Sequence, residues 1–313
     1  SKSISEIVPD AQARSIKERF AQEEAKPTSK IYPLISHVAA EDLPTREVTQ
    51  LLVGLFNAKV QAMYPIFHEP TFARDVEAVY NGSSDAYQNF ALRMVIAISL
   101  QRMDTQYAGL ADSYYLAALK YLEPAVQPMN LKTLQCFALI AGYSLLTPTR
   151  TAVYYVIGLA VRLTQALGLN EEKTIIRGAN GRQADPLEID MRRRCFWIAL
   201  VMDLGLAHSL GRPGTLATGQ EHIDVKWFEM YEDEDITRDG VKHGSQKSIK
   251  KWISIHFFKM RLHQLEIRRK LYQIKRATPK DDQDPWFKEM EKKLIAWRDQ
   301  SPEMDAGSGL NKV

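Results

Sequence analysis

The first segment that could do chemistry is His68-Glu69-Pro70-Thr71-Phe72. It begins like the zinc-binding motif of metalloproteases, in which a second histidine follows four positions after the first on one unbroken helix. Here that position is Phe72, and Pro70 interrupts the helix. We therefore interpret His68 as a turn residue that hydrogen-bonds backbone groups, and Phe72 as an anchor of the next helix in the core.

A second candidate is the acidic run Asp281-Asp282-Gln283-Asp284, which resembles the metal-binding aspartates of isoprenoid synthases, all-α enzymes of similar length. The fifth position, where those enzymes have an acid, is Pro285, and Pro279 places the run in a loop. Acids also stabilise the N-terminus of a helix, which is the simpler interpretation. An isoprenoid-synthase-like enzyme is therefore only the remote alternative.

Other catalytic motifs are missing from the sequence. Gly211-Arg212-Pro213-Gly214-Thr215 lacks the spaced Gly-Lys-Ser/Thr of a phosphate loop, and no Gly-x-Ser-x-Gly elbow occurs. We predict no catalytic residue, no cofactor and no metal ion in this chain.

Two lone charges in apolar segments predict an ion pair. Arg162 is the only charge between Tyr154 and Leu169, and Asp203 is the only charge between Cys195 and Leu210. A buried carboxylate needs a partner, and arginine can hold one with two parallel bonds. Arg212, just after the second segment, is the competing partner. We predict structural roles for all three residues.

The segment Lys247–Arg276 has ten Lys or Arg residues against one acid, Glu266, which would suit contact with phosphates. Its apolar residues fall at helical spacing, however, and indicate one buried face. The acidic stretch Glu229–Asp239 is available to neutralise the basic side chains. We expect packing within the chain or against a partner, and no direct contact with DNA.

The composition is that of an ordinary globular protein: 313 residues, 45% hydrophobic, 25% charged and a net charge of +3. Its two cysteines, Cys136 and Cys195, lie in apolar helical patterns and predict buried free thiols in a reducing compartment. No window is apolar enough for a membrane helix, and the N-terminal residues lack the apolar core of a signal peptide.

Apolar residues recur at helical spacing along most of the chain, which predicts an all-α, single-domain array of packed antiparallel helices. Residues 1–42 read as a flexible arm with a short helix near residues 11–24, residues 43–300 as the helical domain, and residues 301–313 as a flexible tail or an artificial junction. The clearest patterns cover a helix after Pro44, Ala86–Leu100, Ala108–Leu122, Leu131–Leu146 and Ala152–Leu167. Asn130 is placed to cap the fourth of these helices, and Gly168 to end the fifth.

Four ordered blocks resemble the regulatory domain of fungal zinc-cluster transcription factors. The most specific is Arg192–Pro213 (RRRCFWIALVMDLGLAHSLGRP), with an Arg-Arg-x-Phe-Trp entry, an apolar helix with a central Asp, and a Gly-Arg-Pro turn. The others are Tyr64–Phe72 (YPIFHEPTF), Leu131–Tyr143 and Tyr154–Asn170 (YYVIGLAVRLTQALGLN). The resemblance covers about residues 43–225. A zinc cluster needs six cysteines, so we expect this chain to be a fragment without the DNA-binding module.

The resemblance implies a nuclear protein whose regulatory domain controls transcriptional activation through small-molecule sensing, partner binding or both. A pocket for a small hydrophobic ligand or metabolite is expected among Tyr143, Tyr154, Trp197 and Met202, although these residues also suit a filled core. The alternative is a scaffold without a small ligand, which binds coactivators, corepressors or a second copy of itself. Zinc is implied only for the absent DNA-binding module.

Overall fold

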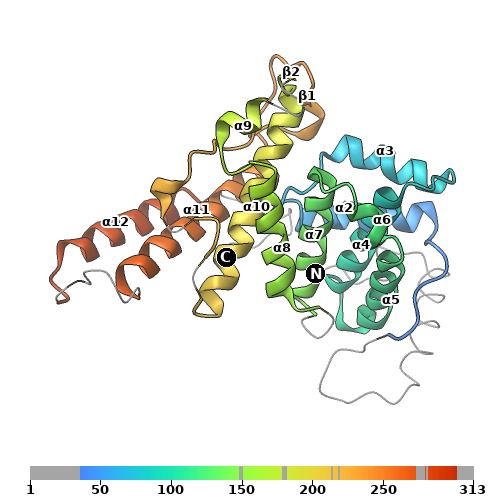
Figure 1. Ribbon diagram of the computed structural model, residues 1–313, viewed down its shortest axis with the longest axis horizontal. Helices are drawn as coiled ribbons and strands as arrows, with labels where there is room; N and C mark the ends of the chain where they lie inside the picture. Colours follow the sequence, from blue (N-terminus) through green and yellow to red (C-terminus); the bar gives the residue numbers. More distant parts are fainter. Residues whose placement is uncertain are drawn as a thin grey trace. The chain divides into compact units, whose positions relative to one another are not determined.

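The computed structural model of the chain describes residues 36–147, 151–177, 182–212, 214–217, 219–272, 279 and 281–301 (Figure 1). These residues form two compact units, of which the first contains residues up to 61 together with 69–156, and the second residues 62–68 together with those from 157 onward. The helix predicted near residues 11–24 and nearly all of the predicted tail lie outside the described residues, so the predicted domain boundaries stay predictions.

The first unit is built around one helix that is buried along its whole length. Its elements are α2 (Arg46–Lys59), α3 (Glu69–Tyr80), α4 (Ala86–Gln101), a 3-10 turn at Thr105–Tyr107, α5 (Ala108–Leu119), α6 (Leu122–Val126), α7 (Leu131–Ser144) and the start of α8 (Val153–Ala166). Helices α2, α3, α5, α6 and α7 all pack against α4. Because α4 is apolar on nearly every side, it needs partners all around it.

Polar side chains fix where these helices begin. Thr45, Asp85 and Asn130 accept hydrogen bonds from backbone N–H groups at the starts of α2, α4 and α7. At α7 the N–H of Asn130 in turn donates to the Thr133 hydroxyl at 3.2 Å, which completes a capping box. The predicted cap at Asn130 is confirmed.

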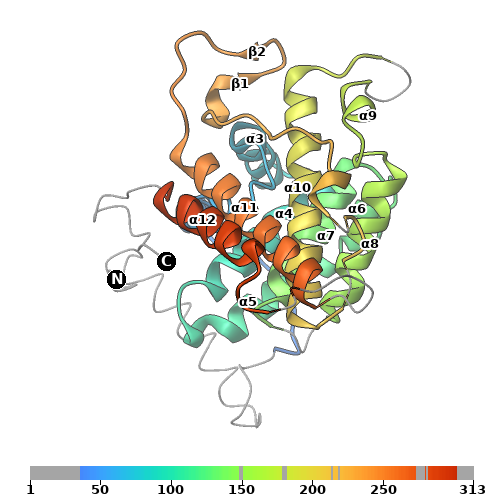
Figure 2. The ribbon, with the colours of Figure 1, turned by 90° about the vertical axis from the view of Figure 1, so that its left-hand side faces the viewer.

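The second unit contains the long helix of the Arg192–Pro213 block, followed by two further helices among the described residues. Its elements are the rest of α8, α9 (Glu172–Arg177), α10 (Pro186–Ser209), 3-10 turns at Gln220–His222 and Asp233–Asp235, the hairpin of β1 (Ile236–Thr237) and β2 (Gly240–Val241), α11 (Ile249–Leu271) and α12 (Pro285–Asp299). The antiparallel strands pair Ile236 with Val241. Helix α10 packs against α9, α11 and the hairpin, and α12 lies beside α11 in both views (Figures 1 and 2).

The predicted all-α class is confirmed, and its errors are confined to short elements. Helix α9 and the hairpin lie outside the helical patterns read from the sequence. Cys136 and Cys195 are buried free thiols as predicted, and burial raises the pKa of each to about 12. Among the described helices, none has the length and apolarity needed to cross a membrane.

Two glycines of the second unit give a matched test of local conformation. Gly168 ends α8 in the left-handed region at φ +66°, as predicted, and a Cβ there would lie 2.6 Å from Cγ2 of Thr174. Gly158, inside α8, has open space where a Cβ would go.

We expect Gly168→Ala to lower the free energy of unfolding by about 1–3 kcal/mol, because it adds backbone strain and a steric clash. Gly158→Ala should raise it by about 0.5–1 kcal/mol, since alanine favours the helix interior. Urea denaturation of both variants checks this, and a Gly168→Ala variant as stable as the unmodified chain would contradict the assignment.

Candidate functional site

The second unit contains a buried cluster of four charges, which we call the Arg194 cluster: Arg194, Asp190, Asp233 and Lys251. Arg194 has no exposed surface, and the other three residues are at most 4% exposed. Nη2 of Arg194 lies 2.6 Å from Oδ2 of Asp190 and 2.7 Å from Oδ1 of Asp233. Lys251 Nζ lies 2.6 Å from the same Asp233 oxygen. Two cations thus meet two carboxylates, and the cluster is formally neutral.

Backbone groups also form hydrogen bonds with members of the cluster. Arg194 Nη1 donates to the carbonyl oxygen of Phe67 at 3.0 Å, and Oδ1 of Asp190 accepts from the N–H of Glu229 at 2.6 Å. The ring of His68 donates through Nε2 to the carbonyl oxygen of Asp233 at 2.7 Å. The cluster therefore joins four parts of the second unit: the segment 62–68, α10, the acidic stretch Glu229–Asp239, which we call the acidic loop, and α11.

The pKa values of the cluster follow from burial opposed by charge. Burial alone would raise the pKa of the Asp233 carboxyl, but Arg194 and Lys251 outweigh it and hold that pKa well below the ordinary 3.8. Burial would likewise lower the pKa of Arg194, but Asp190 and Asp233 raise it instead. Both groups are therefore ionised at neutral pH.

The two structural predictions for the early block are confirmed. His68 bonds a backbone carbonyl, and Phe72 is 3% exposed on α3. One carboxylate of the acidic stretch Glu229–Asp239, Asp233, pairs with Lys251 of the basic segment. Asp284 caps α12 by accepting from the N–H of Trp286 at 2.9 Å, which agrees with the interpretation of the acidic run as a helix start.

The predicted pairing of Asp203 is wrong. Asp203 is 9% exposed, but its carboxylate accepts from the backbone N–H groups of Thr215 and Leu216 at 2.7 and 3.2 Å and from the Thr215 hydroxyl at 3.0 Å. Arg162 is exposed on α8, where it donates to Gln165, and Arg212 is also exposed. The chain returns after α10 and presents its own N–H groups to Asp203, so no arginine is needed there.

The residues predicted for a ligand pocket divide between the two units. In the first, Tyr143 is 1% exposed, stacks on Tyr115 with ring centroids 4.3 Å apart, and donates to Asp112 at 3.1 Å. Burial and the neighbouring Asp112 raise the pKa of Tyr143 above its ordinary value. Tyr154 is 40% exposed beside Tyr155. The ring of Tyr143 is therefore part of a packed core.

In the second unit, Trp197 and Met202 are 2% and 5% exposed on α10. Trp197 stacks on Trp227 with ring centroids 3.8 Å apart, and its indole N–H donates to the carbonyl oxygen of Lys226 at 3.0 Å. The stacking buries the apolar ring of Trp197, and the hydrogen bond pairs its single donor. A ligand role for the four residues stays a prediction.

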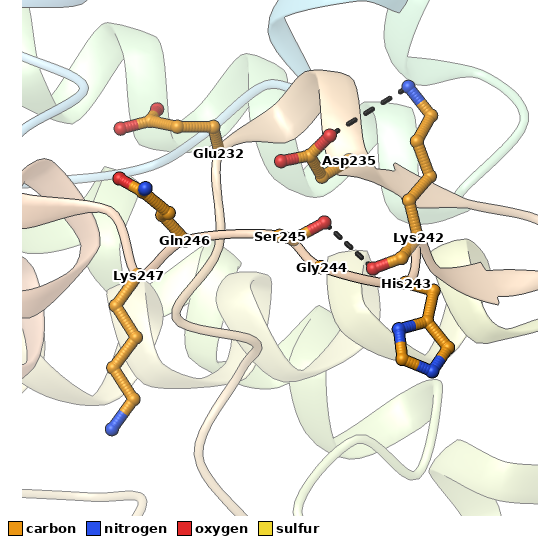
Figure 3. A pocket seen from close by; sticks show the side chains of 8 residues that line it. All are labelled: Glu232, Asp235, Lys242, His243, Gly244, Ser245, Gln246 and Lys247. Atoms are coloured by element: carbon orange, nitrogen blue, oxygen red, sulfur yellow. Dashed lines mark hydrogen bonds and ion pairs between the residues drawn. The ribbon is translucent and has the colours of Figure 1, made fainter.

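A polar depression of about 410 Å³ lies where the β hairpin meets the start of α11, between Glu232 and Lys247 (Figure 3). Lys242 donates to the carbonyl oxygen of Glu234 at 2.5 Å and lies 3.8 Å from Asp235. Glu232 lies 3.9 Å from Lys250. Because these charges are already paired, we assign no ligand to this depression.

Sequence reasoning did not identify the members of the Arg194 cluster. The Arg192-Arg193-Arg194 run was noted, but its three side chains take different partners: Glu188, Glu172 and the cluster. The i, i+4 spacing of Asp190 and Arg194 was an available signal for one pair. Nothing in the sequence singles out Asp233 among the six acids of its loop. Among the described residues, no group of His, Cys, Asp and Glu side chains could hold a metal ion.

The fold and the cluster define an all-α protein whose buried charges are used to join segments. In comparison with known proteins, the profile of the fungal specific transcription factor domain matches residues 53–299. The chain therefore belongs to this family. The match continues well past residue 225, where the resemblance read from the sequence ended.

Curated relatives are transcriptional regulators. The chain is 29% identical over 183 residues to an ABC-transporter-regulating transcription factor of Aspergillus oryzae. This match covers 55% of this chain and 20% of the relative. It is 27% identical over 219 residues to Pyrimidine pathway regulatory protein 1 of Saccharomyces cerevisiae. That match covers 66% of this chain and 23% of the relative. The chain thus spans about a fifth of the length of these relatives. No solved structure matches it.

The Arg194 cluster predicts a large and pH-dependent effect of Asp233→Asn. Removing this charge leaves Arg194 and Lys251 with one buried carboxylate, so the free energy of unfolding should fall by about 3–5 kcal/mol at pH 7. The pKa of the Asp233 carboxyl is lower in the folded chain than in the unfolded chain. Its charge therefore stabilises the fold fully at pH values above the pKa of the unfolded chain, and this stabilisation is lost as the pH falls through the pKa of the folded chain. The difference between the unmodified chain and the variant should therefore be about 1 kcal/mol smaller at pH 3 than at pH 7. Urea denaturation at both pH values measures it, and an equal or larger difference at pH 3 would contradict the account.

The corrected partners of Asp203 predict a contrast between two single substitutions. Asp203→Ala removes the acceptor of three hydrogen bonds and should lower the free energy of unfolding by about 2 kcal/mol. Arg162→Ala should change it by no more than about 0.5 kcal/mol, as for an uninvolved surface residue. Thermal and urea denaturation compare them, and similar losses in both variants would restore the ion pair that we have withdrawn.

Proposed function

We propose that this chain is the regulatory domain of a nuclear fungal transcription factor, and that it controls transcriptional activation by binding a partner protein or a small ligand. The observation that carries the proposal is the family match over residues 53–299. The names of the curated relatives, which are regulators, support it. We also propose that the chain has no enzymatic role of its own.

The internal pairing of charges supports a binding role. The Arg194 cluster, the Arg193–Glu172 pair and the hydrogen-bonded Asp203 each direct ionised groups to neighbours within the second unit. Groups held in this way stabilise a scaffold, whereas groups that react with a substrate must be accessible to it. Regulation would then follow from a population shift, in which a partner or ligand binds one arrangement of the protein more tightly than another.

A transcription assay tests this proposal. The full chain is placed between a heterologous zinc-cluster DNA-binding module and an activation segment, and reporter output in yeast is compared with that of a fusion without the chain. We expect output to differ about fivefold or more at equal protein abundance, the lower range of typical coupling between sites. The Asp233→Asn variant should lose the effect because the second unit is destabilised.

Arg162→Ala is the matched control for this assay, since Arg162 is exposed and not part of the cluster. It should regulate the reporter as the unmodified chain does. Equal output with and without the chain, at equal abundance and nuclear localisation, would refute the proposed function.

A further inference from the structure

The second unit has an apolar groove between its last two helices, which we call the α11–α12 groove. Its volume is about 570 Å³. It is lined by Ile267 and Leu271 of α11 and by Trp286, Phe287, Met290, Glu291, Leu294, Ile295, Trp297 and Arg298 of α12. The two helices lie side by side in both views (Figures 1 and 2). Eight of these ten side chains are apolar, so the groove would release water from apolar surface on binding.

Helix α12 has more apolar surface than α11 covers. Met290 is its only buried residue, and Trp297 reaches α11 by stacking on His256 and donating to its carbonyl oxygen at 2.9 Å. Phe287, Leu294 and Ile295 remain 36%, 37% and 41% exposed. Phe287 and Leu294 are seven positions apart, so they form one stripe along the helix, with Ile295 beside it.

Basic side chains border this apolar stripe. Helices α11 and α12 together carry eleven Lys or Arg residues against four acids. Lys288 and Lys292 are exposed on the row of α12 next to Ile295, and within the described part of the chain neither has an acidic partner. Lys270 lies on the α11 side, next to Leu271 in the chain. Of the two charged residues that line the groove itself, Arg298 is paired with Asp299 and Glu291 is acidic. The lysines beside the groove outnumber this acid, so its rim has a net positive charge while its floor is apolar.

We propose that the α11–α12 groove binds an acidic amphipathic helix of a partner protein. An apolar stripe with seven-residue spacing fits the apolar face of a helix, whose anchors recur at i, i+3, i+4 and i+7. The positive rim complements acidic residues on the flanks of such a helix, and this complementarity selects against basic partners. The 15 residues of α12 set the contact to about four turns.

Direct binding with synthetic peptides tests the groove. The probe is a labelled peptide of about four helical turns, with Leu and Phe on one face and Glu on the others. Two controls have the same residues in scrambled order, or Lys in place of every Glu. Fluorescence anisotropy with the full chain should show saturable binding of the acidic amphipathic peptide, weakened by added salt. Both control peptides should bind about tenfold more weakly or worse.

Substitutions of the chain locate the binding. Leu294→Glu should weaken binding of the acidic peptide about tenfold or more, since it places a negative charge, like those of the peptide, on the apolar floor of the groove. Leu159→Glu is the matched control, because Leu159 is 54% exposed on α8, and it should leave the affinity within about twofold. The double variant Lys288→Glu/Lys292→Glu changes only exposed side chains. It should weaken the acidic peptide and strengthen the basic one, which keeps the test valid if Leu294→Glu unfolds α12.

Several outcomes would overturn the proposal. These are equal binding of the acidic and scrambled peptides, an affinity unchanged by both groove variants, and self-association of the chain that Leu294→Glu abolishes, which would make a second copy the occupant. The inference deepens the proposed regulatory function and rests on it, but the two fail separately. Peptide binding without reporter regulation would remove the function and keep the groove, and the reverse result would do the opposite.

Discussion

Arg194 has no exposed surface, and its charge must be neutralised where it lies. The guanidinium binds Asp190 one turn earlier on α10, Asp233 of the acidic loop and the carbonyl oxygen of Phe67. Asp233 in turn binds Lys251 of α11. The requirement to pair one buried cation thus determines where three other segments of the second unit lie against α10. Moving any of them away would leave an ionised group in the interior without its partner.

The same requirement brings segments that are distant in the sequence to the cluster. Phe67 and His68 belong to a block that precedes α10 by more than a hundred residues, yet both contribute backbone or ring bonds to it. The acidic loop contributes Asp233 through its side chain and its carbonyl oxygen. Because these bonds are geometrically specific, they favour one arrangement of segments, whereas apolar contacts alone would tolerate several.

Much of the fold was predictable because its signals are local. Asn130 and Gly168 were identified from residue type and position, and both act as predicted because capping involves only neighbouring residues. Asp203 shows where such reasoning stops. Its burial followed from the apolar helix around it, but its donors are backbone N–H groups, which every residue has and no sequence pattern reveals. Asp233 could not be told apart from the other acids of its loop, because the path of the loop, and not its composition, brings this one carboxylate to Arg194.

These pairings also separate the parts of the second unit that maintain its shape from the parts available to a partner. The charges near α10 are paired within the protein, whereas Phe287, Leu294 and Ile295 of α12 and the lysines beside them are partly or largely exposed to solvent. A regulatory domain needs both a stable body and an accessible face through which a partner can act on it. The cluster provides the first, and we assign the second to the α11–α12 groove.

The central claim is that the Arg194 cluster makes the second unit cooperative, and native-state hydrogen exchange tests it most directly. If the claim holds, protected amides in residues 62–68, the first half of α10, the acidic loop and the start of α11 should exchange with one common opening free energy. In the Asp233→Asn variant that value should fall by the same amount in all four segments. Independent opening of the acidic loop or α11, with α10 unchanged, would contradict the account.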